Sequence, residues 1–217
     1  PDLLAELSAF MDRHTQKDEW GSPPTTTAVD DNICLSESPT TTDMFLTHGV
    51  SHGLEILCST QTKPGDVVLI ERPTYFLAAD IFASHGLTLQ SLPMRGASGG
   101  VDVDRLEELL QSGEMRPPRM IYVIPTHQNP TARTMSIEDR WKLAIIARRY
   151  GILVAADEVY HLLDWRDVTN DDNPRPARMA LVDSMISSKQ VAEAPRFGCC
   201  VSISSFTKIF APGVRCG

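Results

Sequence analysis

The sequence predicts an α/β fold in three α/β/α layers around a mainly parallel sheet. Four apolar runs of strand length recur along the 217-residue chain, and helical patterns lie between them. The runs are continuously apolar rather than alternating, which is typical of strands buried on both faces of a parallel sheet. Strands that alternate with helices indicate an α/β domain. We expect the strands at 67–70, 120–124, 152–156 and 200–203.

The chain is expected to divide at residue 45. Residues 1–44 are predicted to form an N-terminal helix followed by a Thr- and Pro-rich, partly irregular segment, and residues 45–217 to form the main domain. Two stretches, 15–43 and 165–195, have the composition of loops or insertions.

Two helices of the main domain are indicated by their start signals. Asp102 precedes a helical apolar stripe over 103–110. Further on, Ser136 and Asp139 resemble a capping box ahead of the apolar positions that begin at Trp141. Both helices would connect consecutive strands of the sheet.

Composition narrows the class of function. The formal net charge of −8 and the absence of a Lys/Arg run argue against a nucleic-acid partner and favour small-molecule chemistry. The apolar runs are too short for a membrane span, and no signal peptide is visible, so we expect no membrane partner and a cytoplasmic location. The five cysteines show no metal-site spacing, so we expect reduced thiols and no metal: Cys34, Cys58, Cys199, Cys200 and Cys216.

A glycine-containing segment leads into a helix at residues 47–54. The backbone N–H groups of Gly49, Val50 and Ser51 would lie at the positive end of that helix, which is suited to an anion. An ordinary loop-to-helix junction is the alternative.

Two further segments follow buried strands, where ligands bind in open parallel sheets. Asn129 comes after the strand at 120–124 and could contact a ligand, although Asn-Pro also forms ordinary turns. Asp157 emerges from the strand at 152–156 and could pair with a protonated ring nitrogen, with Tyr160 donating to a ring oxygen. The alternative for Asp157 is a helix N-cap.

The fourth segment, 204–215, places a lysine between hydroxyls in an apolar setting. Desolvation would lower the pKa of Lys208 and leave an amine suited to a Schiff base, and Arg215 offers a fork of donors to a phosphate. A buried lysine without a task is costly, which favours the functional interpretation.

Together these motifs resemble the fold-type I pyridoxal-phosphate (PLP) enzymes of aminotransferase class I/II, in particular their large domain. The resemblance rests on Asn-Pro, then Asp-x-x-Tyr, then Ser-x-x-Lys with a later Arg, and it runs from about Phe45 to Gly217. The lysine segment, with Ala-Pro-Gly-Val-Arg after it, is most similar to the aminoadipate and kynurenine aminotransferase branch.

The resemblance implies a role for each motif residue. Lys208 would carry pyridoxal 5'-phosphate as a Schiff base, Asp157 would keep the pyridine nitrogen protonated, and Tyr75 would stack on the ring. Asn129 and Tyr160 would hold the ring's phenolic oxygen. The phosphate would be bound by a larger group: Gly49, Val50, Ser51, Ser205, Thr207 and Arg215.

The activity implied is transamination between an amino acid and a 2-oxo acid, with Lys208, Asp157 and Tyr160 as catalytic residues, in a full-length homodimer. Other chemistry on the same cofactor, such as a lyase or an aminocyclopropane-carboxylate-synthase type reaction, shares every motif. A non-catalytic, ligand-sensing aminotransferase-like domain is the alternative from another class.

Several features depart from the family pattern. Ala132 occupies a position that is usually glycine, and the stretch between Tyr160 and Lys208 is longer than usual. The family's small domain, with its substrate-binding arginine, has no counterpart in this sequence. We therefore expect a truncated large domain with one sheet strand fewer, low stability and little or no turnover.

Overall fold

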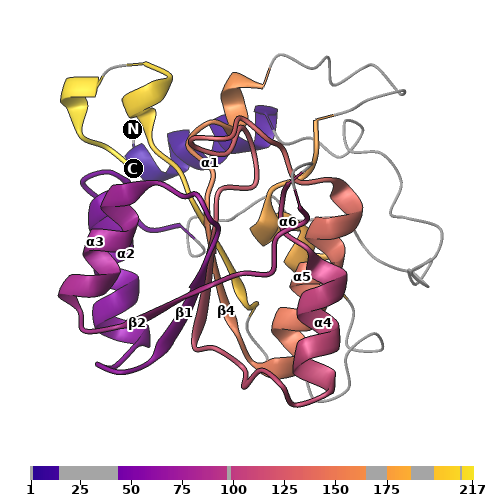
Figure 1. The fold of residues 1–217 in the computed structure, drawn as a ribbon. Coiled ribbons are helices and arrows are strands. Elements are labelled where there is room, and N and C mark those ends of the chain that lie inside the picture. The colour runs from indigo at the N-terminus through magenta and orange to yellow at the C-terminus, as the bar shows by residue number, and fades with distance from the viewer. Residues whose placement is uncertain (1, 15–43, 97–98, 165–174, 187–197, 211) are drawn as a thin grey trace.

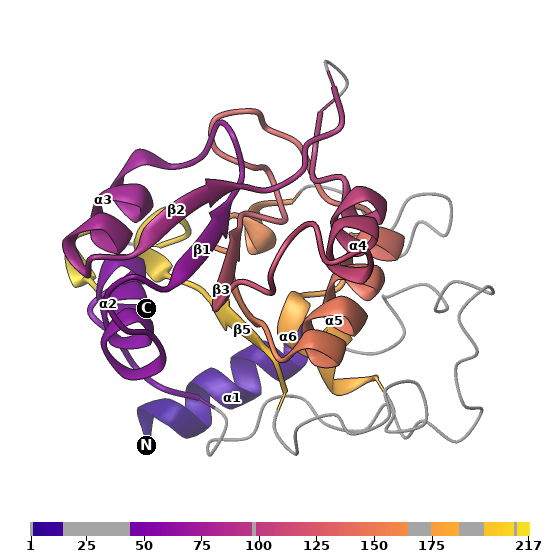
Figure 2. The same cartoon turned by 60° about the horizontal axis from the view of Figure 1, so that its bottom comes forward.

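The computed structural model describes residues 2–14, 44–96, 99–164, 175–186, 198–210 and 212–217. Within these ranges a single sheet separates two groups of helices (Figures 1 and 2). The α-helices are α1 (Leu3–His14), α2 (Val50–Gln61), α3 (Phe76–Ser84), α4 (Val103–Gln111), α5 (Ile137–Tyr150) and α6 (Met179–Ser184). The strands are β1 (Val67–Ile70), β2 (Thr88–Ser91), β3 (Met120–Val123), β4 (Leu153–Asp157) and β5 (Cys200–Ile203). The described residues also form the 3₁₀ turns η3 (His161–Leu163), η4 (Phe206–Lys208) and η5 (Pro212–Val214).

The sheet has the order β2-β1-β3-β4-β5, and every pairing is parallel. Its two faces bury separate apolar clusters. Side chains of α4, α5 and α6 pack on one face, and those of α2 and α3 pack on the other. The predicted α/β fold with a parallel sheet and helices on both faces is confirmed, and all four predicted strands are present within a residue or two.

Helix ends follow the start and stop signals in the sequence. The Asp102 side chain accepts a hydrogen bond from the Arg105 amide at 3.1 Å and caps α4. Ser136 accepts from the Asp139 amide at 3.1 Å and begins α5, which ends at Gly151 in a left-handed conformation with φ of 65°.

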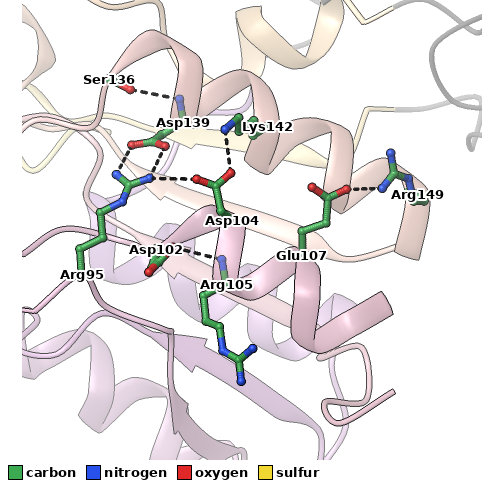
Figure 3. Close-up of polar contacts among 9 residues, drawn as sticks. All are labelled: Arg95, Asp102, Asp104, Arg105, Glu107, Ser136, Asp139, Lys142 and Arg149. Atoms are coloured by element: carbon green, nitrogen blue, oxygen red, sulfur yellow. Dashed lines mark hydrogen bonds and ion pairs between the residues drawn. The ribbon is translucent and has the colours of Figure 1, made fainter. Parts of the chain in front are cut away.

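A row of ion pairs joins α4 to α5 (Figure 3). Arg95, on the segment before α4, donates to both carboxylate oxygens of Asp139 at 2.6 and 2.8 Å. Lys142 of α5 donates to Asp104 of α4 at 2.7 Å. Because these side chains are partly exposed, the pairs contribute modestly to stability and mainly fix how the two helices align.

The structure corrects part of the sequence-based description. The stretch 165–195, expected to be a loop or insertion, contains helix α6, while 165–174 and 187–195 lie outside the described residues, as does the Thr- and Pro-rich segment 15–43. The N-terminal helix is present as α1, where Phe10 lies against Phe206 with ring centroids 6.0 Å apart.

Two other elements, β2 and α3, were not predicted from the sequence. Four cysteines within the described residues are free thiols, and Cys34 lies outside them. No helix in the described ranges is long and apolar enough to cross a membrane.

Candidate functional site

The candidate site lies along the edge of the sheet where the strands end. Because all the strands are parallel, their carboxyl ends meet at this edge. Glu71 directly follows β1, Pro125 lies just beyond β3, Asp157 is the last residue of β4, and Ser204 directly follows β5. Four segments far apart in the sequence are thereby brought together.

Asp157 is buried, and its two carboxylate oxygens have different surroundings. Oδ2 accepts a hydrogen bond from the Tyr122 hydroxyl at 2.8 Å, whereas Oδ1 has no hydrogen-bond partner among the described residues. Burial raises the pKa of Asp157 to about 6, although the Tyr122 hydroxyl, the Val159 amide and the charge of Lys208 act in the opposite direction. The N-cap alternative is wrong, because the next helical turn is η3, which begins at His161 with Tyr160 as its cap.

Tyr122 is a member of this site that the sequence analysis missed. It lies in β3, is fully buried, and packs edge-on against Phe82 with ring centroids 5.4 Å apart. Burial, together with the neighbouring Asp157 carboxylate, raises the pKa of its hydroxyl well above the usual value. A signal was available, since a tyrosine inside a continuously apolar strand needs a partner for its hydroxyl.

Glu71 is a second buried carboxyl that the sequence analysis passed over. It is 4% exposed, and one of its oxygens accepts from the Ile124 amide at 2.8 Å. Burial raises its pKa to about 7. A carboxyl directly after an apolar strand was the signal that could have drawn attention to it.

The start of α2 lies next to Arg215. Gly49 precedes α2 with φ of 88°, and a Cβ placed on Gly49 would lie 3.1 Å from Nη2 of Arg215. No side chain caps the helix, and its first turn contains no acidic residue. The positive end of α2 and a guanidinium therefore lie together, which is an arrangement suited to an anion.

Backbone hydrogen bonds connect the segment before α2 to the segment after β5. The Thr47 amide donates to the Gly217 carbonyl at 2.7 Å, and the Gly217 amide donates to the Thr47 carbonyl at 2.9 Å. The Ser205 hydroxyl, 5% exposed, lies 2.9 Å from the Thr207 hydroxyl and 3.0 Å from the Cys216 carbonyl, and it accepts from the Thr207 amide. Ser205 thus holds its own segment together.

Lys208 ends η4, and its side chain is exposed. The expected desolvated, apolar setting for this lysine is therefore wrong, and the apolar residues that follow it, Ile209 and Phe210, are themselves exposed. Its charge nevertheless acts on Asp157, whose pKa it lowers. Arg215 is also exposed and has a left-handed backbone with φ of 51°.

The remaining predicted residues lie around the same edge without direct bonds to Asp157 or Lys208. Tyr75 is half-buried and precedes α3, close enough to Tyr122 to contribute to the raised pKa of that hydroxyl. Asn129 lies in the loop after β3 and Tyr160 at the start of η3, both half-buried. Neither of their side-chain polar groups makes a hydrogen bond within the described part of the chain, and their assigned roles stay predictions.

Comparison with protein families shows which family the chain is related to. A model of the family described as aminotransferase class I and II matches residues 37–217. The chain belongs to this family. The family match and the similar solved structures confirm, at the level of family and fold, the resemblance seen in the sequence motifs. Class I and II aminotransferases use PLP.

Individual relatives agree with this placement. An aromatic amino acid aminotransferase of Schizosaccharomyces pombe is 32% identical over 185 residues, which cover 81% of this chain and 37% of that protein. Among solved structures, α-aminoadipate aminotransferase from Thermus thermophilus has a TM-score of 0.64 at 25% identity, covering 98% of this chain and 50% of the other. Kynurenine aminotransferase from Pyrococcus horikoshii has a TM-score of 0.63 at 27% identity, covering 80% and 38%. The chain thus spans half or less of these relatives.

Proposed function

We propose that this chain is the cofactor-binding part of a PLP-dependent aminotransferase that transfers an amino group between an amino acid and a 2-oxo acid. The observation that carries the proposal is the buried Asp157 carboxylate, held through Oδ2 by Tyr122 and unpartnered at Oδ1 within the described residues. A buried carboxylate oxygen without a partner is costly, and a protonated ring nitrogen would supply the missing donor.

The proposed cofactor phosphate would bind at the start of α2. Gly49 leaves space beneath the Arg215 guanidinium that a larger side chain would fill. The amides of Val50 and Ser51 would donate to phosphate oxygens, Arg215 would donate from the opposite side, and the Thr207 hydroxyl would add a further donor. This donor set fits a dianionic phosphate.

The chemistry would be divided between cofactor and chain. When bound, PLP supplies an electron sink for the electrons released at the substrate α-carbon. Asp157 would hold the proton on the ring nitrogen, and Asn129 and Tyr160 would bind the phenolic oxygen. Lys208 would provide the amine that attaches the cofactor, and its Nζ would then move the α-proton as general base and acid.

The whole protein's substrates and assembly are part of this proposal. Because the chain spans 37% of the S. pombe relative, we propose that it acts within a longer protein that dimerises as the family resemblance implies. The relatives' names suggest that aromatic amino acids, kynurenine and 2-aminoadipate should be tested first as amino donors.

The proposal can be tested by trapping the cofactor. The purified chain is incubated with PLP and reduced with borohydride, and the modified residue is located by mass spectrometry. We expect a phosphopyridoxyl label on Lys208 and its loss in Lys208→Ala.

Lys63→Ala is the matched control, because Lys63 is also exposed but follows the far end of α2. This variant should label on Lys208 as the unchanged chain does. Equal labelling of Lys63 and Lys208 in the unchanged chain would rule out Lys208 as the cofactor-binding lysine. The absence of label on Lys208 would also rule it out, provided that the sample shows α/β circular dichroism and unfolds cooperatively.

A further inference from the structure

Tyr122 and Asp157 form a buried pair across neighbouring strands. Both side chains lie on the face of the sheet covered by α2 and α3, and the register pairs Tyr122 with Ala155, two residues before Asp157. The 2.8 Å bond between them is buried at both ends, so water cannot replace the Tyr122 hydroxyl as donor.

We propose that Tyr122 is a positioning residue for the cofactor site: its hydroxyl fixes the Asp157 carboxylate through Oδ2 and so reserves Oδ1 for the cofactor's ring nitrogen. The inference rests on the proposed function and deepens it. Tyr122 itself would not touch the reacting atoms, but it would control the ionisation of Asp157 and the orientation of its carboxylate.

The physical reason is the competition between burial and hydrogen bonding at Asp157. Burial raises the pKa of this carboxyl, while the bond from Tyr122 favours the ionised form. Glu158 on the same strand end raises the pKa further, and the charge of Lys208 lowers it. Glu71 and Tyr75 also act on Tyr122 from the β1 side. Without the hydroxyl, Asp157 would hold its own proton to higher pH and could no longer stabilise a proton on the ring nitrogen.

The first measurement needs no cofactor. The pKa of Asp157 is determined from the carboxyl ¹³C shift in the 217-residue chain and in Tyr122→Phe. We expect the pKa to rise by about one unit, which is a tenfold change in proton affinity. Phe82→Leu is the packing control, because it disturbs the neighbour of the Tyr122 ring but keeps the hydroxyl.

The second measurement uses PLP labelled with ¹⁵N in the ring, whose shift reports protonation of that nitrogen. In Tyr122→Phe the ring nitrogen should lose its proton at a lower pH than in the unchanged chain or in Phe82→Leu. In an Asp157→Asn background, Tyr122→Phe should change this titration no further. If Tyr122→Phe does not fold, 3-fluorotyrosine placed at position 122 keeps the ring, strengthens the donor and should lower the Asp157 pKa.

The outcomes separate the two proposals. A wild-type chain that takes the label on Lys208, with the same ring-nitrogen titration in wild type and Tyr122→Phe, overturns the inference alone. An Asp157 pKa that is unchanged in folded Tyr122→Phe, or that shifts equally in Phe82→Leu, also overturns it. A folded wild-type chain that takes no label overturns the proposed function and this inference with it.

Discussion

Replacing Arg140 with methionine should destabilise the chain more than any exposed arginine substitution. Arg140 is fully buried in α5. Its guanidinium donates to three carbonyls and a hydroxyl: Met135 at 3.1 Å, Ala177 at 2.6 Å, Pro125 at 2.6 Å and the Thr126 hydroxyl at 2.9 Å. It also lies 3.6 Å from the Glu158 carboxylate, which is equally buried. One side chain therefore connects the loop after β3, the start of α6 and the residue beside Asp157.

The magnitude follows from what the substitution leaves behind. Methionine has a similar length and fills most of the space, so little of the loss comes from a cavity. The acceptors remain buried without their donor, and Glu158 loses the Arg140 charge, which leaves Arg178 as a buried cation acting on it. Removing one partner of a buried ion pair costs about 3–5 kcal/mol. Against a total of about 5–15 kcal/mol for a folded domain, this is a large share.

Urea unfolding, followed by circular dichroism, measures the loss directly. With a slope of about 1–3 kcal/mol per molar urea, the midpoint should fall by more than about 1 M. Arg116→Met is the matched control, because Arg116 is exposed on the segment after α4 and should change stability by less than about 0.5 kcal/mol. An Arg140→Met midpoint within experimental error of that control would refute the reasoning.

Two other substitutions test the backbone conformation of Ala132 and the raised pKa of the Glu71 carboxyl. Ala132 has φ of 58°, a left-handed conformation that is unfavourable for alanine by about 1–2 kcal/mol. Ala132→Gly should therefore raise the free energy of unfolding by about 1 kcal/mol. An unchanged or lower free energy of unfolding in urea would contradict this. Burial raises the pKa of Glu71 from 4.5 to about 7, so the folded state binds the proton more tightly and stability falls as pH rises through this window. Glu71→Gln removes that dependence, and its stability relative to wild type should increase by up to about 3 kcal/mol between about pH 4 and about pH 8; a constant difference would count against the raised pKa.

The strands that the sequence predicted are the three inner strands, β1, β3 and β4, and the edge strand β5, which is buried at its two ends and partly buried between them. Continuous apolar runs predict β1, β3, β4 and β5 because each of these strands is covered by helices. Strand β2 was missed because its side chains, Thr-Leu-Gln-Ser, are mostly exposed and form no apolar run, whereas the other edge strand, β5, has buried residues at both ends. Its place in the sheet depends on pairing with β1, which no local pattern records.

Helices were predictable where a cap and an apolar stripe coincide. Helices α4 and α5 have Asp102 and Ser136 as N-caps that accept the expected amide bonds. Helix α3 is apolar over much of its circumference, with Phe76 exposed and Phe82 buried, so it shows no stripe. Helix α6 has six residues and no side-chain cap.

Some site residues could also be predicted from the sequence, whereas the surroundings of others could not. Asp157 and the segment that contains Arg215 were expected at one edge because each follows a strand of a sheet predicted to be parallel. The setting of Lys208 was predicted wrongly, since burial depends on which segments cover η4 and not on the apolar residues beside it in sequence. Tyr122 was missed because its partner is 35 residues away.

Among the titratable groups at this edge, Asp157 gives the strongest argument for a ligand. Glu71 is buried, but the amide of Ile124 accounts for its position, and its pKa, raised to about 7, leaves about half of this carboxyl neutral at pH 7. Tyr122 is neutral, and its hydroxyl donates a hydrogen bond to Asp157. Asp157 has a pKa of about 6 and is mostly ionised at neutral pH, with one oxygen buried and unpartnered in the described part of the chain. A buried negative charge with an open hydrogen-bond position is unfavourable in the chain alone, and it becomes favourable when a cationic donor binds there.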